Sequence, residues 1–213
     1  AASLAIIESG SVGKIPDKAN SLIQIAKQNS LRLQSLISDL LDMDKLLANQ
    51  MEFNLDNYDA LGTMQGPIDA NKYYAEKYQI TFRITQVEEH TLFHADITRA
   101  LQVLGHLLSN AAKFSPAHSS VDIAITRKTR WVRFSVTDHG AGIPNEFKAQ
   151  IFNSFSQADS SSTRTKDGSG LGLTISRELV EKMGGNIGFT SSPGQGSCFY
   201  IELPLAKINS TLP

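Results

Sequence analysis

The sequence predicts an α+β fold in which helices cover one face of a sheet of mostly antiparallel strands. Two patterns carry this prediction. Residues 121–126 and 131–138 alternate apolar and polar side chains across a short polar turn, as in a β-hairpin. Residues 96–113 and 169–183 place apolar side chains three or four positions apart, which is typical of helices packed on a core. With 213 residues, of which 41% are hydrophobic, the chain has room for one large domain or for a medium domain with an appendage.

The charge and the cysteine content narrow the class of protein. A formal net charge of −1 lacks the basic excess of a nucleic-acid-binding surface. Cys198 is the only cysteine, which excludes an intramolecular disulfide and fits a reducing compartment. No apolar run approaches the roughly 20 residues that cross a bilayer, and residues 1–10 lack the basic segment of a signal peptide. We therefore expect a soluble, cytoplasmic fragment, and its abrupt start predicts that it comes from a longer protein.

The longest periodic segment runs from Asp17 to Gln50 and predicts a helix. Its apolar seam, with steps of three and four, consists of Leu33, Leu36, Leu40, Met43 and Leu47. The stretch 10–17, which contains glycine and proline, predicts a turn between two helices with Asp17 as the N-cap. A helix with such a broad apolar face needs a hairpin partner, a second copy of the chain, or both.

The other predicted elements rest on shorter patterns. They are a helix over 58–78 interrupted near Gly66–Pro67, a strand over 80–85, a polar loop over 160–170, and a last hairpin of strands 186–191 and 197–204. Gly184–Gly185 predicts the end of the helix that begins at Ser169. Helices and mostly antiparallel strands are mixed, so the class is α+β, and no internal repeat is evident.

The first segment with candidate chemistry is HLLSNAAKFSP, residues 106–116, at the end of a predicted helix. His106, Asn110 and Lys113 are spaced by four and three residues, so they share one helix face. An amide oxygen is a hard ligand that suits Mg²⁺, and a lysine suits a phosphate group. Asn and Lys are also common on the solvated face of a helix C-terminus, so the segment alone fits both interpretations.

The second segment is DHGAGIP, residues 138–144, directly after a predicted strand. Asp138 stands where the strand ends, and Gly140 and Gly142 allow another backbone or a flat ligand to come close. One carboxylate beside glycines suits the exocyclic amine of a purine. The alternative is an ordinary Asp-x-Gly turn.

Two further segments follow. FNSFSQ, residues 152–157, has two aromatic residues three apart, which most often indicates core packing. DGSGLGL, residues 167–173, is a glycine-rich loop before a helix, where backbone amides and the helix dipole can bind an anion. It lacks the Gly-Lys-Ser/Thr of a P-loop, and neither a βαβ unit nor a parallel sheet is predicted around it. We therefore expect a loop that wraps phosphates without either of these common nucleotide motifs.

In this order and spacing, the segments resemble the ATP-binding domain of sensor histidine kinases, in the GHKL superfamily that also contains gyrase B. HLLSNAAKFSP resembles the N box, DHGAGIP the first glycine box, FNSFSQADSSSTR the F box and lid, and GSGLGL the second glycine box. SSPGQGSCFYIELP is similar to the terminal hairpin. The resemblance covers residues 59–205. It implies the Bergerat α/β sandwich, in which helices cover one face of a mixed sheet.

The resemblance implies roles for individual residues. Asn110 would ligate Mg²⁺ at the ATP phosphates, Lys113 would contact those phosphates, and Asp138 would accept a hydrogen bond from the adenine amine. Phe155 would anchor the lid, and Arg164 would reach the triphosphate from it. The remaining nucleotide-binding residues that it implies are Gly140, Gly142, Ile143, Gly168, Ser169, Gly170, Leu171, Gly172 and Leu173. ATP and Mg²⁺ are therefore the expected cofactors.

Residues 1–57 resemble the dimerisation and histidine-phosphotransfer hairpin of the family, and LRLQSLISDLLDMDKL is close to the end of its second helix. This resemblance implies a homodimer through the N-terminal helices and an ATP-binding catalytic domain over 58–213. The phosphoacceptor histidine of the family belongs before the turn at 10–17. The histidines of the chain all follow that turn: His90, His94, His106, His118 and His139. We therefore expect the acceptor segment to lie before Ala1.

His106 departs from the family pattern, which usually has a second asparagine at this position. A histidine there could touch metal-bound water or act as a base, and it could equally weaken the handling of Mg²⁺. It also replaces the general-base carboxylate of the ATP-hydrolysing branches, which disfavours simple ATP hydrolysis.

The function implied by the resemblance is transfer of the γ-phosphoryl group of ATP to a histidine, and from there to an aspartate of a response regulator. The alternative is a dimeric nucleotide-binding scaffold, or pseudo-kinase, that binds ATP without transferring phosphate. Many members of the family are membrane-anchored sensors, and the sequence leaves open whether the intact protein is one of them.

Overall fold

The computed structural model describes residues 13, 16–154, 156 and 170–206. Contacts between Cα atoms divide the chain into two compact units, Ala1–Gln50 and Met51–Pro213, which are described separately below. The functional boundary between residues 57 and 58 stays a prediction.

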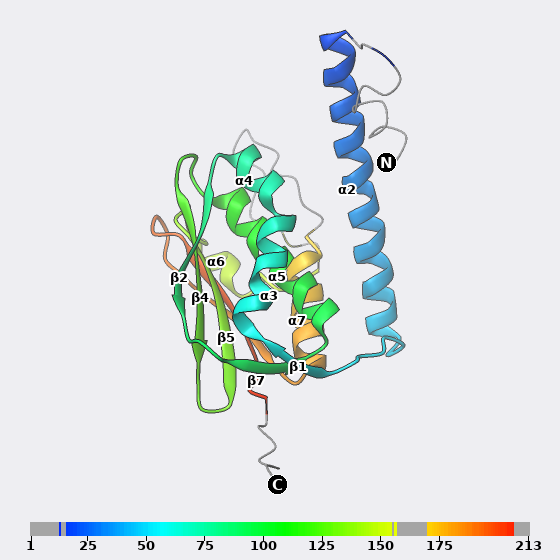
Figure 1. Ribbon diagram of the computed structural model, residues 1–213. Coiled ribbons are helices and arrows are strands. Elements are labelled where there is room, and N and C mark those ends of the chain that lie inside the picture. The colour runs from blue at the N-terminus through cyan, green and yellow to red at the C-terminus, as the bar shows by residue number, and fades with distance from the viewer. Residues whose placement is uncertain (1–12, 14–15, 155, 157–169, 207–213) are drawn as a thin grey trace. The chain divides into compact units, whose positions relative to one another are not determined.

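The first unit contains helix α2, Asp17–Leu47, drawn in blue in Figure 1. Its N-cap is Pro16, whose carbonyl oxygen accepts hydrogen bonds from the backbone of Ala19 and Asn20 at 2.8 and 3.0 Å. Asp17 is therefore the first helical residue, and the predicted cap lies one position too late. Apolar side chains remain exposed along this helix, namely Leu22, Ile25, Leu33, Ile37, Leu40, Leu41 and Leu47.

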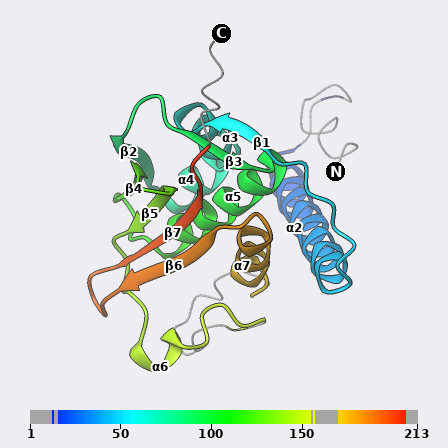
Figure 2. The ribbon, with the colours of Figure 1, turned by 90° about the horizontal axis from the view of Figure 1, so that it is seen from below.

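The second unit is built on a five-stranded sheet with the order β2-β4-β5-β7-β6. The strands are β2 (Thr81–Val87), β4 (Ser120–Arg127), β5 (Trp131–Asp138), β6 (Asn186–Ser191) and β7 (Ser197–Pro204). Figures 1 and 2 show helices α3 (Ala60–Ala70), α5 (Ile97–Phe114) and α7 (Gly172–Lys182) together on one face of this sheet. The predicted α+β class, with helices on one face of the sheet, is confirmed.

One strand pair is parallel, which confirms the mixed sheet that the family resemblance implied. β2 and β4 run in the same direction, with Thr81 opposite Ser120, whereas β4–β5, β5–β7 and β6–β7 are antiparallel. The chain leaves β2, passes through α5 on the covered face, and returns as β4. A crossover of this kind is what a parallel pair requires, because a short turn reverses the chain direction.

The core lies between the sheet and these helices. Side chains of β4 and β5 alternate strictly between buried and half-buried, as a sheet with one covered face demands. The buried apolar side chains of the strands are Val121, Ile123, Ile125, Val132, Phe134, Val136, Ile201 and Leu203. They face Ala100, Leu104, Leu107, Leu108, Ile175 and Leu179 of the helices. Burial of this apolar surface is the main term that holds the helices on the sheet.

Helices α5 and α7 begin in different ways, and a glycine follows the C-terminus of α7. Asp96 caps α5, because its side chain accepts a hydrogen bond from the backbone N–H of Arg99 at 3.1 Å. The N-cap residue of α7, Leu171, makes no side-chain capping hydrogen bond. Gly184, with φ +76°, follows the C-terminus of α7 in the left-handed region, as predicted. Within the described ranges, no helix is both long enough and apolar enough to span a membrane.

The region between residues 56 and 95 corrects the sequence analysis. Gly66 and Pro67 lie inside α3, and the break comes at Asn71 instead. The backbone and side-chain nitrogens of Asn71 both donate to the Pro67 carbonyl, at 3.1 and 2.9 Å, which ends α3 before α4 (Lys72–Tyr78) begins. Two four-residue strands, β1 (Asp56–Asp59) and β3 (Leu92–Ala95), were not predicted; they pair antiparallel in a separate small sheet. A short helix, α6 (Asn145–Lys148), follows β5.

Candidate functional site

Asp138 is a buried carboxylate at the end of β5, only 4% exposed. Its Oδ1 accepts a hydrogen bond from the backbone N–H of Gly140 at 2.9 Å. Directly across the β5–β7 pair stands Ser197, which is also buried. A buried carboxylate needs hydrogen-bond donors, and it can accept several of them. The end of β5 therefore presents a strong acceptor inside the protein.

Three glycines let backbone segments close around Asp138. A Cβ at Gly140 would collide with the carbonyl oxygen of Phe114, at the end of α5. A Cβ at Gly196 would collide with the carbonyl oxygen of Asp138 itself. Gly142, with φ +69°, is in the left-handed region, and a Cβ there would collide with the carbonyl oxygen of Ser192. The predicted reason for Gly140 and Gly142, close backbone approach, is thus what the fold requires.

Ser191 joins the loop after Asp138 to the last hairpin. Its Oγ accepts a hydrogen bond from the backbone N–H of Ile143 at 2.9 Å and donates one to the carbonyl of Gly196 at 2.9 Å. Its single proton is then used, so the Oγ of Ser197, 3.0 Å away, acts as the donor to Ser191. These bonds hold Ile143, Gly196 and Ser197 in one fixed arrangement beside Asp138.

His106, Asn110 and Lys113 lie on the last turns of α5. The helix is continuous through these positions, so the predicted common face exists, and all three side chains are half-buried. The Lys113 Nζ sits over the ring of Phe114 at 5.2 Å from its centroid. A polar, partly exposed edge of α5 therefore lies next to the loop that follows Asp138, because the carbonyl of Phe114 lies against Gly140.

The start of α7 packs against the same helix. Gly170, with φ +71°, turns the chain, and buried Leu171 precedes the first helical residue, Gly172. A Cβ on Gly172 would lie 3.6 Å from the Cγ of His106, which is an ordinary contact distance. The N-cap residue of α7, Leu171, makes no side-chain capping hydrogen bond, and the first backbone N–H groups and the positive end of the dipole of a helix are suited to an anion.

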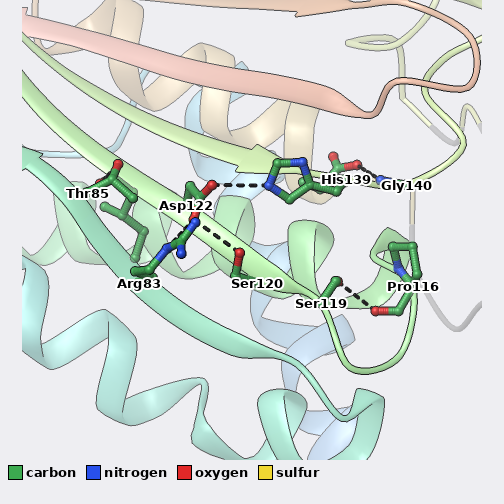
Figure 3. A network of polar contacts seen from close by, with 10 residues as sticks. Arg83, Thr85, Pro116, Ser119, Ser120, Asp122, His139 and Gly140 are labelled. Carbon is green, nitrogen blue, oxygen red and sulfur yellow. Dashed lines mark hydrogen bonds and ion pairs between the residues drawn. The ribbon is translucent and has the colours of Figure 1, made fainter.

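A polar network crosses the open face of the sheet near the end of β5. Figure 3 shows Asp122 of β4 between Arg83 of β2 and His139, the residue after Asp138. Asp122 Oδ1 accepts from Arg83 Nε at 2.9 Å, and Asp122 Oδ2 lies 3.1 Å from His139 Nε2. The hydrogen bond from Arg83 is the main reason that the pKa of Asp122 is below its ordinary value, with His139 and Ser120 adding to it. The network ties three strands together beside the site.

Four of the predicted site residues, Asp138, Gly140, Gly142 and Ile143, lie together at the end of β5 and directly after it. Gly196 and Ser197, which were not predicted, lie beside them. Leu173, beside Gly172 in the first turn of α7, is half-buried. Phe155, Arg164, Gly168 and Ser169 lie outside the described residues. Phe152 packs edge-on against Phe189 of β6, with ring centroids 5.9 Å apart, as core packing predicts.

Sequence analysis missed Ser191 and Ser197 as members of the site. Both serines lie in the motif SSPGQGSCFYIELP, which follows the two glycine boxes in the sequence. That position could have indicated that the motif belongs to the site. Nothing local in that motif indicates that Ser197 stands opposite Asp138, because this follows from the pairing of β5 with β7.

The sequence from residue 95 to residue 207, just over half of the chain, matches the family described as histidine kinase-, DNA gyrase B-, and HSP90-like ATPase. The chain belongs to this family. The buried Asp138, the glycines around it and the N-terminus of α7 all fall within the matched residues. ATP is accordingly the nucleotide that this ATPase-family domain uses.

Curated relatives of this ATPase family extend the match. The circadian input-output histidine kinase CikA of Synechococcus elongatus is 31% identical over 199 residues, which is 90% of this chain and 26% of the relative. The sensor protein GacS of Pseudomonas syringae is 37% identical over 186 residues, 82% of this chain and 20% of the relative. The chain therefore spans about a quarter or less of the length of these two relatives.

A solved structure of full-length ShkA in complex with AMPPNP is similar to this chain, with a TM-score of 0.76 and 27% identity. The match covers 99% of this chain and 47% of that structure. The fold of this ATPase-family chain thus agrees with a structure that was solved with an ATP analogue.

The polar side chains of α5 include an oxygen ligand of the kind that Mg²⁺ prefers. In proteins Mg²⁺ usually keeps several water ligands and is also bound by phosphates of the substrate. Asn110 offers one amide oxygen at the edge of the site. Among the described residues, no group of three or more His, Cys, Asp or Glu side chains could hold a metal ion. A metal bound by these described residues would therefore be shared with the phosphates of a nucleotide.

Proposed function

We propose that Asp138 accepts a hydrogen bond from the exocyclic amine of the adenine of ATP, with Gly140, Gly142 and Ile143 forming the adjoining wall. The observation that supports this proposal is the buried carboxylate of Asp138 at the end of β5. It is surrounded by glycines, at which other backbone segments come so close that a side chain would not fit. A neutral amine can supply a hydrogen-bond donor, which a carboxylate buried away from bulk solvent needs.

For the phosphates, we propose Asn110 and Lys113 of α5 together with the loop that leads into α7. Asn110 would hold Mg²⁺ through its amide oxygen, and Lys113 would contribute a positive charge. The backbone N–H groups from Gly170 to Leu173 would face phosphate oxygens at the positive end of the helix dipole. When bound, Mg²⁺ would neutralise the negative charge that hinders attack on the γ-phosphate. Phe155, Arg164, Gly168 and Ser169 complete the proposed set on the basis of the motif alone.

We further propose that the intact protein is a protein-histidine kinase. In this reaction an imidazole nitrogen of an acceptor histidine attacks the γ-phosphorus, the bond to the bridging oxygen breaks, and ADP leaves. The phosphoryl group then passes to an aspartate of a response regulator. Phosphoryl transfer depends mainly on positioning and on charge neutralisation, which is what the residues of this domain supply. Support comes from the relatives, since CikA is named a histidine kinase and GacS a sensor protein.

A homodimer through α2 is the proposed assembly. Leu33, Leu40 and Leu47 are 58%, 59% and 71% exposed, and they recur every seven residues, as in a helix that packs in a bundle. An apolar stripe of this length on one helix favours a partner helix over solvent.

One experiment tests the proposed kinase. The complete protein is incubated with Mg-ATP, and the product is examined for a phosphoryl group that is labile in acid and stable in base. Such a product is expected. Tight ATP binding without it would contradict the kinase and support the alternative of a nucleotide-binding dimeric scaffold.

A further inference from the structure

His106, Ser176 and Gly172 form a chain of hydrogen bonds between α5 and α7. The Nδ1 of His106 lies 3.2 Å from the Oγ of Ser176, and that Oγ lies 2.7 Å from the carbonyl oxygen of Gly172. Ser176 has no exposed surface, and the ring of His106 packs against the first turn of α7. The chain of bonds therefore links the helix that carries Asn110 to the first residue of the helix behind the glycine loop.

The direction of both bonds follows from counting protons. A carbonyl oxygen only accepts, so the single hydroxyl proton of Ser176 is donated to Gly172. The Oγ of Ser176 must then accept at its other contact, and the donor there is Nδ1–H of His106. A neutral His106 ring is thereby the Nδ1–H tautomer, and its Nε2 is the acceptor nitrogen.

We propose that His106 and Ser176 form a positioning pair, in which the His106 Nδ1–H donates to the Ser176 Oγ and fixes the first turn of α7 against α5. This turn contains the backbone N–H groups that the proposed function assigns to phosphate oxygens. The pair thus holds two parts of the site at a fixed separation, although they are far apart in the sequence. This role rests on the proposed nucleotide site, but the tautomer does not.

The same tautomer decides what the ring can contact. Phosphate oxygens only accept hydrogen bonds, as does the Nε2 of a neutral Nδ1–H ring. Water bound to a cation donates, so a neutral His106 is matched to metal-bound water and not to the phosphate. His106 and Lys113 therefore have different partners on one helix face, because lysine only donates.

The tautomer can be measured on the chain without any nucleotide. Long-range proton–nitrogen NMR spectra of the ¹⁵N-labelled protein, at a pH at which the ring is neutral, distinguish protonated from unprotonated ring nitrogens. His106→Asn assigns the signals, because they disappear in this variant. We expect a protonated Nδ1 and an unprotonated Nε2 in the native chain. We expect loss of this preference in Ser176→Ala, which is compatible with the helix because alanine is a good helix former.

Ser109→Ala is the matched control, since the Oγ of Ser109 donates only to the carbonyl of His106 within α5, at 3.0 Å. It should leave the tautomer of His106 unchanged. A protonated Nε2 in the native chain would overturn the pair. So would a His106 signal that is the same in Ser176→Ala as in the native chain.

The positioning role is tested by calorimetric titration with Mg-ATP. Ser176→Ala should weaken the affinity roughly three- to tenfold, the equivalent of one lost hydrogen bond, while Ser109→Ala should not. His106→Asn keeps an N–H donor one atom beyond Cγ, in the place of Nδ1, so it should weaken binding less than His106→Leu. Equal losses in these two variants would overturn the positioning role. If the native chain itself failed to bind ATP, the proposed function would fail, and the NMR result would still decide the pair.

Discussion

Asp138 and Ser197 stand opposite each other across β5 and β7, and both side chains are buried. Between them and solvent lie the loop of Gly140 and Gly142 and the turn that ends at Gly196. This relationship places a buried carboxylate opposite a buried hydroxyl. The first prediction tests what that acceptor binds.

Asp138→Asn should weaken ATP binding roughly 10- to 100-fold, the range for one hydrogen bond to a charged group. The amide oxygen of Asn can still accept from the Gly140 N–H, so the loop keeps its conformation. The NH₂ group would oppose the adenine amine, since both are donors. Calorimetric titration measures the change. Glu202→Gln, which removes a carboxylate paired with Arg133 elsewhere on the sheet, serves as the control and should bind normally.

Asn110→Ala should lower the rate of histidine phosphorylation in the complete protein by roughly 100-fold or more, because the metal that neutralises the phosphates loses its protein ligand. Asn110→Asp should also lose phosphorylation, since it alters the charge at the same ligand. The measurement is incorporation of labelled phosphate from ATP over time. Normal turnover in both variants would exclude Asn110 as the metal ligand.

Gly142→Ala should destabilise the domain by about 1–3 kcal/mol, because a Cβ there meets the carbonyl of Ser192 and the positive φ disfavours alanine. Gly172→Ala is the contrasting variant. Its Cβ would only touch the ring of His106 at ordinary distance, so the melting temperature should stay close to that of the native chain. Thermal unfolding of the two variants decides between these expectations; equal melting temperatures would show that the tight approach at Gly142 is not needed.

Asp122→Asn should reduce stability at neutral pH, and the difference from the native chain should shrink in acid. The pKa of Asp122 is lowered in the folded state, chiefly by the hydrogen bond from Arg83. A carboxyl group whose pKa is lower in the folded state stabilises the fold at pH values above the ordinary aspartate pKa, about 3.9. This stabilisation is lost as the pH falls through the lower pKa of the folded state. Denaturant unfolding at neutral pH and near pH 3 measures both quantities. A difference that grows in acid would contradict the network as described.

Leu33→Glu combined with Leu40→Glu should convert the proposed homodimer to a monomer, because charges would have to be buried between helices. Sedimentation equilibrium gives the mass of the assembly. Gln24→Glu with Gln34→Glu, at exposed polar positions of the same helix, controls for added charge and should remain dimeric. A monomeric mass for the native protein would contradict the proposed homodimer.

Much of the fold was predictable because one face of the sheet is covered. In β4 and β5 the covered face imposes strict alternation, and this alternation is visible in the sequence. β1 and β3 were missed, because four residues are too few for the period to show. The break in the helical region was predicted at Gly66–Pro67. A proline inside a helix removes one backbone hydrogen bond, and α3 continues through Pro67 despite this loss. The break occurs where Asn71 captures the Pro67 carbonyl.

The site was predictable where its residues are neighbours in the sequence. Asp138, Gly140 and Gly142 are close in the sequence, so the motif that they form indicated a carboxylate acceptor beside glycines. Ser197 and Ser176 could not be assigned in this way. Ser197 reaches Asp138 only through the register of β7 against β5, and Ser176 reaches His106 only because α7 packs on α5. Such contacts depend on tertiary structure.

The pairing of β5 with β7 also has a thermodynamic consequence. Asp138 and Ser197 come from strands about 60 residues apart in the sequence and meet only when β5 pairs with β7, so the unfolded chain does not hold them together. A ligand that binds the folded state alone adds a stability of RT ln(1 + [L]/Kd), about 2.7 kcal/mol at a hundred times Kd. The free energy of unfolding of this domain would then rise with the concentration of ATP.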